Sequence, residues 1–389
     1  MVTTRLPLRD NLIGQGIVLT TLTFMTLGLV FISSTSGTLS ERTAWYNRPD
    51  VRQAMYAPVA LLILCLFWRL DYHLLDRRPW AGVRLLRWIP APAMLLVILG
   101  LALSAVVLIP HVGFEVGGQR RWLKFGPVQF QPSEVLKFAL LIYLAVFLSR
   151  RQVEPKAFVR TFLPLIGLTG LSVMLVIEYN FSTAAVMGVA AAAVMLMGGV
   201  RWFYLLGLAV PAAAGFYAYV VREPHRWERI TVFLDPWSKT NPASFQPWQS
   251  LIWIAAGANP PGLGAGVAKY GYLPEDDTDF IFTTVSYETG IVGAVVVIGL
   301  LLVWLYLVRR SAIDAADRQG SLLAAGLGFA IILQAALHIA VTLVVVPTTG
   351  ISLPFVSVGG TALWIMSAAT AVIISVTARR EADASRLPE

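Results

Sequence analysis

Four acidic residues fall within five positions of one another, immediately before a long apolar run. They are Glu275, Asp276, Asp277 and Asp279. Pro274 disfavours a helix ahead of them, whereas Asp279 is a good N-terminal cap for a helix that begins near Phe280. The spacing therefore places the Asp279 carboxylate where the chain passes from water into an apolar segment. Two roles are open at this point: a helix cap, or a general base that accepts a proton from a substrate.

A basic segment upstream has the residue types of an anion-binding loop. It reads Gly117-Gly-Gln-Arg-Arg-Trp-Leu-Lys124 and joins two glycines to three cations. Glycine lets a backbone approach a ligand closely, arginine binds phosphate oxygens through two parallel hydrogen bonds, and lysine adds a point charge. The segment therefore predicts a phosphate site in which Arg121 takes part, with anchoring at the membrane interface as the alternative.

Ionisable residues also enter the next apolar run. Gln131-Pro-Ser-Glu134 opens that run, and Lys137 follows three residues after Glu134, on the same face of a helix. Lys137 then lies about one turn inside the membrane, where such side chains face the protein interior or a wet cavity. The pair is either structural or part of a polar channel for substrate, and we expect the channel. Further on, Gln334 and His338 are one turn apart and are expected to satisfy each other.

The composition describes the elements that must position these residues. Of the 389 residues, 57% are hydrophobic and 13% are charged, and apolar runs of about 20 residues recur along the chain. This excludes a soluble globule and predicts an all-α polytopic membrane protein. Its single cysteine, Cys65, excludes an intrachain disulfide. We expect about ten transmembrane helices, near 12–34, 52–70, 88–110, 133–149, 161–178, 182–200, 202–221, 280–308, 321–346 and 360–378.

Charge distribution predicts the orientation. The formal charge of +8 comes from short basic clusters at the ends of the apolar runs, so topology explains it and nucleic acid binding is not expected. The basic gaps at 71–87, 150–160 and 309–320 place those loops, and both termini, in the cytoplasm. The segment at 222–279 then becomes a large extracytoplasmic loop, long enough to be functional. We expect one domain over residues 1–389, in the cytoplasmic membrane.

Two outer segments have the composition of a ligand-lined cavity. The large loop contains the glycine run Gly262-Leu-Gly-Ala-Gly266 and the cation Lys269, which suit a lipid headgroup lying close to backbone. The last outer loop, 347–361, has no charge but many hydroxyls and glycines, as expected of a segment that lines a cavity.

With these residues in place, the chain resembles the SEDS family of RodA and FtsW proteins. The resemblance extends over nearly the whole chain and rests on motifs in the family's order: Gly118-Gln-Arg-Arg-Trp-Leu123, Gln131-Pro-Ser-Glu134 with Lys137, Arg229-Ile-Thr-Val-Phe-Leu-Asp-Pro-Trp237, Gln249-Ser250, Tyr272-Leu-Pro-Glu275, Thr278-Asp-Phe-Ile-Phe282 and Leu353-Pro-Phe-Val-Ser357 with Gly359-Gly360. It implies a ten-span peptidoglycan glycosyltransferase that polymerises lipid II on the outer face of the cytoplasmic membrane. The Gly-Gln-Arg-Arg-Trp sequence and the short termini are closer to RodA, which acts in elongation and cell shape, than to FtsW, which acts in division.

The resemblance also implies a site and a partner. Asp279 takes the position of the family's essential aspartate and would be the catalytic residue, and the partner would be a class B penicillin-binding protein, a transpeptidase. No cofactor is certain, although the acids at 275–277 could attract a divalent cation such as Mg²⁺ or Mn²⁺. The residues expected to bind substrate are Arg121, Lys137, Glu134, Gln131, Ser133, Lys269, Glu275, Ser357, Gly359 and Gly360.

Several positions depart from the family pattern. They are Asn180, Asp277, Tyr287 and Val358, where the family usually has aspartate, histidine, glutamate and tyrosine. They leave Asp279, Arg121 and Lys137 unchanged, so they bear on the tuning of the site.

The implied chemistry agrees with the residues themselves. Joining a sugar hydroxyl to an anomeric carbon that carries a polyprenyl pyrophosphate needs one carboxylate as base and cations for the leaving group. Two other classes stay open: a flippase or transporter of a lipid-linked precursor, with Glu134, Lys137 and Glu288 along its path, and a scaffold that only recruits the transpeptidase.

Overall fold

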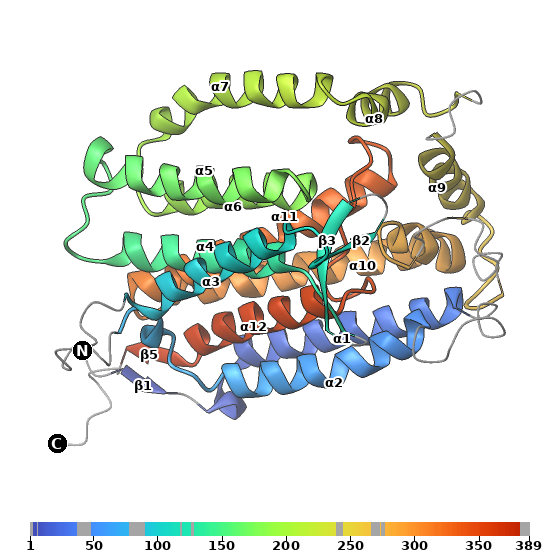
Figure 1. Ribbon diagram of the computed structural model, residues 1–389. Coiled ribbons are helices and arrows are strands. Elements are labelled where there is room, and N and C mark those ends of the chain that lie inside the picture. Colours follow the sequence, from blue (N-terminus) through green and yellow to red (C-terminus); the bar gives the residue numbers. More distant parts are fainter. Residues whose placement is uncertain are drawn as a thin grey trace.

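The computed structural model is an all-helical bundle with two small sheets (Figure 1). It describes residues 3–5, 7–36, 48–77, 90–116, 119–125, 128–238, 244–265, 273 and 277–381. Helices that run the length of the bundle are α1 (Leu12–Thr35), α2 (Pro49–Phe67), α3 (Pro92–Val107), α4 (Pro132–Ser149), α5 (Leu163–Ile177), α6 (Phe181–Met197), α7 (Trp202–Val221), α10 (Ile281–Ile313), α11 (Arg318–Thr342) and α12 (Gly360–Thr377).

The predicted membrane class is confirmed. Among the described residues, eight helices are long and apolar enough to cross a membrane: α1, α2, α4, α5 with the π-turn Phe158–Phe162 that precedes it, α7, α10, α11 and α12. The two shorter apolar helices, α3 and α6, fall at the two remaining positions where we expected spans. The count of ten membrane crossings stays a prediction.

The centre of the bundle is formed by α4, α11 and α12. Inside the protein lie 78% of the apolar stretch of α4, 72% of that of α12 and 61% of that of α11. Helix α7 contrasts with them, since only 6% of its stretch is covered; it contacts α5 through a hydrogen bond from the Tyr219 hydroxyl to the carbonyl oxygen of Ile177 at 2.6 Å. The polar residues carried by α4 and α11 are therefore enclosed by protein.

Helix α10 is broken near one end. Gly290 has φ 68° and ψ −163°, which is not helical, and it separates a short piece at 281–289 from the long remainder. A side chain there would also collide with the residues that follow α9 (Phe245–Ala256), because a Cβ on Gly290 would lie 2.9 Å from the carbonyl oxygen of Gly257. We expected one continuous span at 280–308; the structure divides it where only glycine fits.

The two sheets lie at opposite ends of the bundle (Figure 1). Strands β2 (Gly113–Val116), β3 (Gln119–Phe125) and β4 (Val128–Phe130) form an antiparallel sheet in the order β2-β3-β4, at the end where α10 begins. Strand β1 (Thr3–Arg5) pairs with β5 (Arg379–Glu381) near both termini. We call these the Asp279 end and the termini end. Two short 3-10 turns, Leu8–Asp10 and Tyr72–Leu75, lie at the termini end.

Candidate active site

Asp279 and Arg121 meet at one glycine. A Cβ atom placed on Gly350 would lie 3.1 Å from Oδ2 of Asp279 and 3.5 Å from Nη1 of Arg121. The carboxylate and the guanidinium are thus neighbours, although 158 positions separate them in the chain. All three residues are half-buried. The structure therefore brings together the acid and one of the cations that the sequence singled out.

Asp279 does not occupy the cap position that its sequence context allowed. Helix α10 begins at Ile281, and its N-cap residue is Phe280. The Phe280 ring is buried against Trp253 and Leu273, which fixes the turn at 277–280 to the loop residues around it. The carboxylate one residue earlier is directed toward Gly350 instead.

The loop at 347–361, which the sequence predicts to be outer, holds the turn that carries Asp279. Ser357 Oγ donates a hydrogen bond to the carbonyl oxygen of Thr278 at 2.7 Å, and the amide of Val358 donates to the carbonyl oxygen of Asp277 at 3.0 Å. Ser357 Oγ in turn accepts from the amide of Leu353 at 2.8 Å. Ser357, expected to bind substrate, is 4% exposed and here fixes the backbone on the N-terminal side of Asp279.

The two glycines after Ser357 let the loop turn into α12 against α2. The Gly359 amide lies 3.5 Å from Oε1 of Gln53, and a Cβ on Gly360 would lie 2.8 Å from the ring of Tyr56. Substituting Gly360 would displace the packed ring of Tyr56, which is 3% exposed. Both glycines, also expected to bind substrate, make these packing contacts.

Gln131 and Ser133 are joined to neighbouring elements at the start of α4. Thr361 Oγ1 accepts from the Gln131 amide at 3.2 Å and donates to the carbonyl oxygen of Gln129 at 2.8 Å. Ser133 is 0% exposed, and Nδ2 of Asn180 lies 3.5 Å from its Oγ. Asn180, a departure from the family pattern, also caps α6 through the amide of Thr183.

The ion pair predicted on α4 is present. Lys137 Nζ donates to both carboxylate oxygens of Glu134, at 2.9 and 2.8 Å, and to Oε1 of Gln334 on α11 at 2.7 Å. Lys137 is 0% exposed and Glu134 is 4% exposed. Because an ammonium has three donors, these three bonds use all of them. The structure thus shows the pair as a structural ion pair, which was the alternative to a substrate channel. A role of these residues in substrate binding stays a prediction.

The prediction that Gln334 and His338 bond to each other is wrong. Gln334 Nε2 donates to the carbonyl oxygen of Ser352 at 3.0 Å, and His338 Nδ1 lies 2.7 Å from the carbonyl oxygen of Ile351. Both side chains reach the last outer loop, which the one-turn spacing could not reveal because it depends on how that loop packs on α11.

Two further residues near the site, Gly350 and Arg229, were not among the predicted site residues, although Arg229 opens one of the family motifs. Gly350 stands in an uncharged Thr-Thr-Gly run, and its only signal was the glycine itself. Arg229 lies on α8 (Pro224–Leu234), and its Nη1 is 3.5 Å from the carbonyl oxygen of Thr348. Lys269, Glu275 and Asp276 lie outside the described residues. Within the described ranges, no group of three or more His, Cys, Asp or Glu could hold a metal ion.

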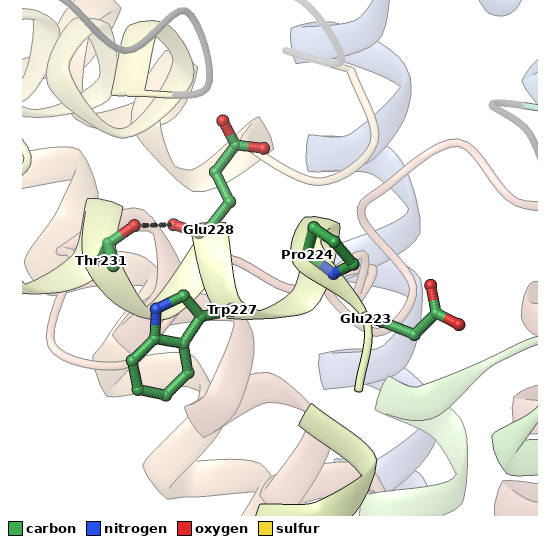
Figure 2. A pocket seen from close by; sticks show the side chains of 5 residues that line it. All are labelled: Glu223, Pro224, Trp227, Glu228 and Thr231. Carbon is green, nitrogen blue, oxygen red and sulfur yellow. Dashed lines mark hydrogen bonds between the residues drawn. The ribbon is translucent and has the colours of Figure 1, made fainter. Parts of the chain in front are cut away.

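A surface pocket lies on another face of α8 (Figure 2). Its volume is about 570 Å³, and it is lined by Glu223, Pro224, Trp227, Glu228 and Thr231. None of the residues predicted to form the site lines it. We therefore place the candidate site at Gly350.

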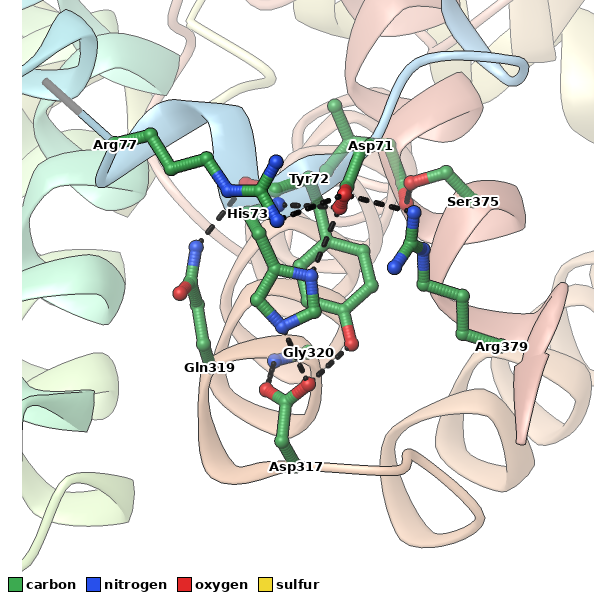
Figure 3. Close-up of polar contacts among 10 residues, drawn as sticks. Asp71, Tyr72, His73, Arg77, Asp317, Gln319, Gly320, Ser375 and Arg379 are labelled. Atoms are coloured by element: carbon green, nitrogen blue, oxygen red, sulfur yellow. Dashed lines mark hydrogen bonds and ion pairs between the residues drawn. The ribbon is translucent and has the colours of Figure 1, made fainter. Parts of the chain in front are cut away.

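A second charged cluster lies at the termini end (Figure 3). His73 contacts two carboxylates, with Nδ1 2.8 Å from Asp71 Oδ1 and Nε2 2.9 Å from Asp317 Oδ2. Asp71 also pairs with Arg379 at 2.8 Å, and Asp317 caps α11 through the amide of Gly320 at 2.8 Å. Burial raises the pKa of Asp71, but hydrogen bonds from the backbone and ring of His73 and the charge of Arg379 outweigh it, so the net pKa lies below its usual value.

Comparison with known proteins identifies the family. A family model described as cell cycle protein, of the FtsW, RodA and SpoVE type, matches residues 15–382. The chain is 34% identical over 379 residues to a probable peptidoglycan glycosyltransferase FtsW from Nitrosococcus halophilus, covering 94% of this chain and 91% of that protein. It is 32% identical over 368 residues to the stage V sporulation protein E of Bacillus subtilis, covering 93% and 96%.

Solved structures share the fold over nearly the whole chain. One chain of a peptidoglycan synthase complex, described as coordinating polymerization and crosslinking, superposes with a TM-score of 0.74 at 26% identity, covering 93% of this chain and 97% of that one. The rod shape determining protein RodA of Thermus thermophilus superposes with a TM-score of 0.64 at 25% identity, covering 95% and 97%. The motifs, the membrane fold and these matches agree: the chain belongs to the SEDS family of FtsW, RodA and SpoVE proteins.

Proposed function

We propose that this protein is a peptidoglycan glycosyltransferase that polymerises lipid II into glycan strands. The observation that carries the proposal is the meeting of Asp279 and Arg121 at Gly350. A carboxylate beside a guanidinium provides a base and a phosphate-binding cation, which this reaction needs. Family membership and the name of the Nitrosococcus halophilus relative support the same reaction.

In the proposed reaction Asp279 is the general base. It takes the proton from the acceptor sugar hydroxyl as that oxygen attacks the anomeric carbon of the donor. The new glycosidic bond forms while the bond from the anomeric carbon to the pyrophosphate oxygen breaks, and its electron pair leaves with the polyprenyl pyrophosphate. Attack from the face opposite the leaving group inverts the anomeric carbon. Arg121 is the cation we assign to the pyrophosphate, whose negative charge grows as the bond breaks.

The other residues expected to bind substrate fall into two groups in this proposal. Lys269 and Glu275 belong to the outer loop and would contact the lipid headgroup directly. The remaining residues act through the scaffold, since each is buried or bonded to a neighbouring element: Glu134, Lys137, Gln131, Ser133, Ser357, Gly359 and Gly360. Lys137 in particular would act on the site through Gln334.

We propose that the Asp279 end faces the outside of the cytoplasmic membrane. The termini end carries the basic loops, including Arg150, Arg310 and Arg318, which favour the cytoplasm. A reporter fused at Arg310 should then be cytoplasmic, and one fused near Lys239 should be external.

The comparisons give elongation no advantage over division. The two relatives that are similar in sequence are named FtsW and stage V sporulation protein E, whereas one similar solved structure is that of RodA. A division polymerase therefore has at least as much support as the elongation polymerase that the sequence motifs favoured. For either role we propose a class B penicillin-binding protein as partner, supported by the neighbour taken from a complex that couples polymerization to crosslinking.

One observation favours a transporter as the second candidate. Discontinuous helices are typical of transporter binding sites, and α10 is broken at Gly290 beside the buried Glu288. Purified protein in liposomes containing lipid II separates the two functions. Glycan polymer formed by the wild type and lost in Asp279→Asn supports the polymerase. Movement of lipid II across the bilayer without polymer, unchanged in Asp279→Asn, would support the transporter and overturn the proposal.

A further inference from the structure

Helix α11 presents two polar side chains to successive peptide groups of the last outer loop. His338 bonds the carbonyl oxygen of Ile351 at 2.7 Å, and Gln334 bonds the carbonyl oxygen of Ser352 at 3.0 Å. His338 is 0% exposed and Gln334 is 4% exposed. Two side chains one helical turn apart therefore bond to two consecutive carbonyl groups of the loop.

These two peptides directly follow the contact point of the site. Gly350 precedes Ile351, and it is the residue against which Asp279 and Arg121 both lie. A shift of the 351–352 backbone would move Gly350 with it, because one peptide bond joins them. The position of the surface behind Asp279 thus depends on two side chains that do not touch the carboxylate.

The bond from His338 has a defined direction. A carbonyl oxygen only accepts, so Nδ1 must carry the hydrogen, and Nε2 of a neutral ring then bears the lone pair. Nε2 is buried and has no hydrogen-bond partner within the part of the chain that the structure describes. The polar contribution of His338 to the described structure therefore comes from Nδ1 alone.

Gln334 connects the same loop to the buried ion pair. Its Oε1 accepts from Lys137 Nζ at 2.7 Å while its Nε2 serves Ser352, so one amide joins α4 to the loop. Lys137 is itself fixed by Glu134. The loop is consequently anchored to the most enclosed helix of the bundle.

We propose that His338 and Gln334 are positioning residues for the reaction, which hold Ile351 and Ser352 so that Gly350 keeps Asp279 and Arg121 in their reactive arrangement. This inference rests on the proposed polymerase function. A misplacement of reacting groups by about 1 Å is enough to cost on the order of 10²-fold in rate, so a modest loop shift has a measurable effect. The simpler alternative is that these bonds only satisfy buried polar groups and stabilise the fold.

Two matched substitutions of His338 separate these explanations. In His338→Asn the side-chain amide nitrogen falls near the position of Nδ1 and keeps the bond to Ile351. In His338→Gln the amide nitrogen falls near the position of Nε2 and loses it. The full-length protein is purified with each change and assayed for lipid II polymerisation in liposomes, together with its thermal unfolding in detergent.

We expect His338→Asn to keep kcat within about threefold of the wild type, and His338→Gln to lower kcat by about 10²-fold with a smaller change in KM. A kcat of His338→Gln at the wild-type level overturns the inference. So does an equal loss in both variants that follows their loss of thermal stability. A wild-type protein that makes no polymer refutes the proposed function instead, so the two failures are distinguishable.

Gly350→Ala tests the same arrangement without altering α11. The φ of Gly350 lies outside the left-handed region, so alanine is free of backbone strain there, but its Cβ would press on Oδ2 of Asp279 at 3.1 Å. We expect a folded protein with kcat lowered by at least tenfold. If Gly350→Ala polymerises lipid II at the wild-type rate, the position of this peptide does not control the reaction and the inference is wrong.

Discussion

The charged groups at the two ends of the bundle are used in different ways. At the termini end, the carboxylates of Asp71 and Asp317 make the bonds that join elements, to His73, Arg379 and the first turn of α11. At the Asp279 end, hydroxyl and backbone groups make much of that connection: Ser357 and Val358 hold the peptides at 277 and 278.

Under the proposed function, this difference separates an acid that stabilises the fold from an acid that takes part in the reaction. An acid whose oxygens join elements loses those bonds when it is protonated or replaced, so its contribution is to stability. An acid whose backbone is fixed by other groups keeps its place in the fold when its side chain exchanges a proton. The same residue type thus has two functions, set by which atoms hold it in position.

The substitution with the largest expected effect on the reaction removes the proposed base, Asp279. Asp279→Asn keeps the shape of the side chain and removes its basicity, so we expect lipid II polymerisation to fall by about 10²–10⁴-fold while membrane insertion is unchanged. Asp277→Asn is the matched control, because its backbone carbonyl makes the bond to Val358 whatever its side chain. If Asp277→Asn is the inactive variant, Asp279 is not the base.

The buried pair on α4 should show the largest effect on stability. Lys137→Met leaves the Glu134 carboxylate enclosed without its cation, and we expect the free energy of unfolding to fall by about 3–5 kcal/mol. Adding Glu134→Leu removes the second charge and should restore much of that loss. Unfolding in detergent, followed by heat or denaturant, measures both variants. A stable single variant would mean that another group compensates the charge of Glu134.

Replacing Arg121 should weaken the use of substrate without affecting the fold. Arg121→Ala removes the cation beside Asp279, and we expect kcat/KM for lipid II to fall by about 10²-fold. Arg120→Ala is the control, since Arg120 is the adjacent residue of β3 and is more exposed than Arg121. Equal losses in the two variants would indicate a general attraction of anions rather than a specific contact.

The smallest expected effect is the pH dependence at the termini end. The pKa of Asp71 is lower in the folded protein than in the unfolded chain, so its ionised form stabilises the fold. That stabilisation is present above the ordinary aspartate pKa, near pH 4, and is lost as pH falls through the lower folded value. Asp71→Asn should therefore destabilise by about 1 kcal/mol or less at pH 7 and by less below pH 4. A constant difference across this range would contradict it.

The sequence predicted the elements better than their contacts. Apolar runs and basic clusters depend on local composition, so the membrane class and the positions of α1 to α7 and α10 to α12 could be derived. Asp279 could be singled out because proline and acids precede an apolar run. Gly350 could not, since its importance arises from Asp279 and Arg121, which reach it from distant parts of the chain.

The errors have the same origin. Gln334 and His338 have a helical spacing that suits a hydrogen bond between them. Each packs under a loop instead, and bonds to the carbonyl oxygens of that loop. The break in α10 was missed because Gly290 lies in an apolar run like any other transmembrane glycine. Only the approach of the Gly257 carbonyl from outside the helix makes that position special.

We infer that the break at Gly290 acts as a joint between the long piece of α10 and the short piece that follows Asp279. A continuous helix tilts as one rod when the membrane is thicker or thinner than its apolar length. We expect the long piece of α10 to tilt while the short piece at 281–289, which follows Asp279, stays packed on α9. The rate of polymerisation should therefore vary by less than about threefold between bilayers whose acyl chains differ by a few carbons. A steep dependence of rate on bilayer thickness would show that tilt reaches the site despite the joint.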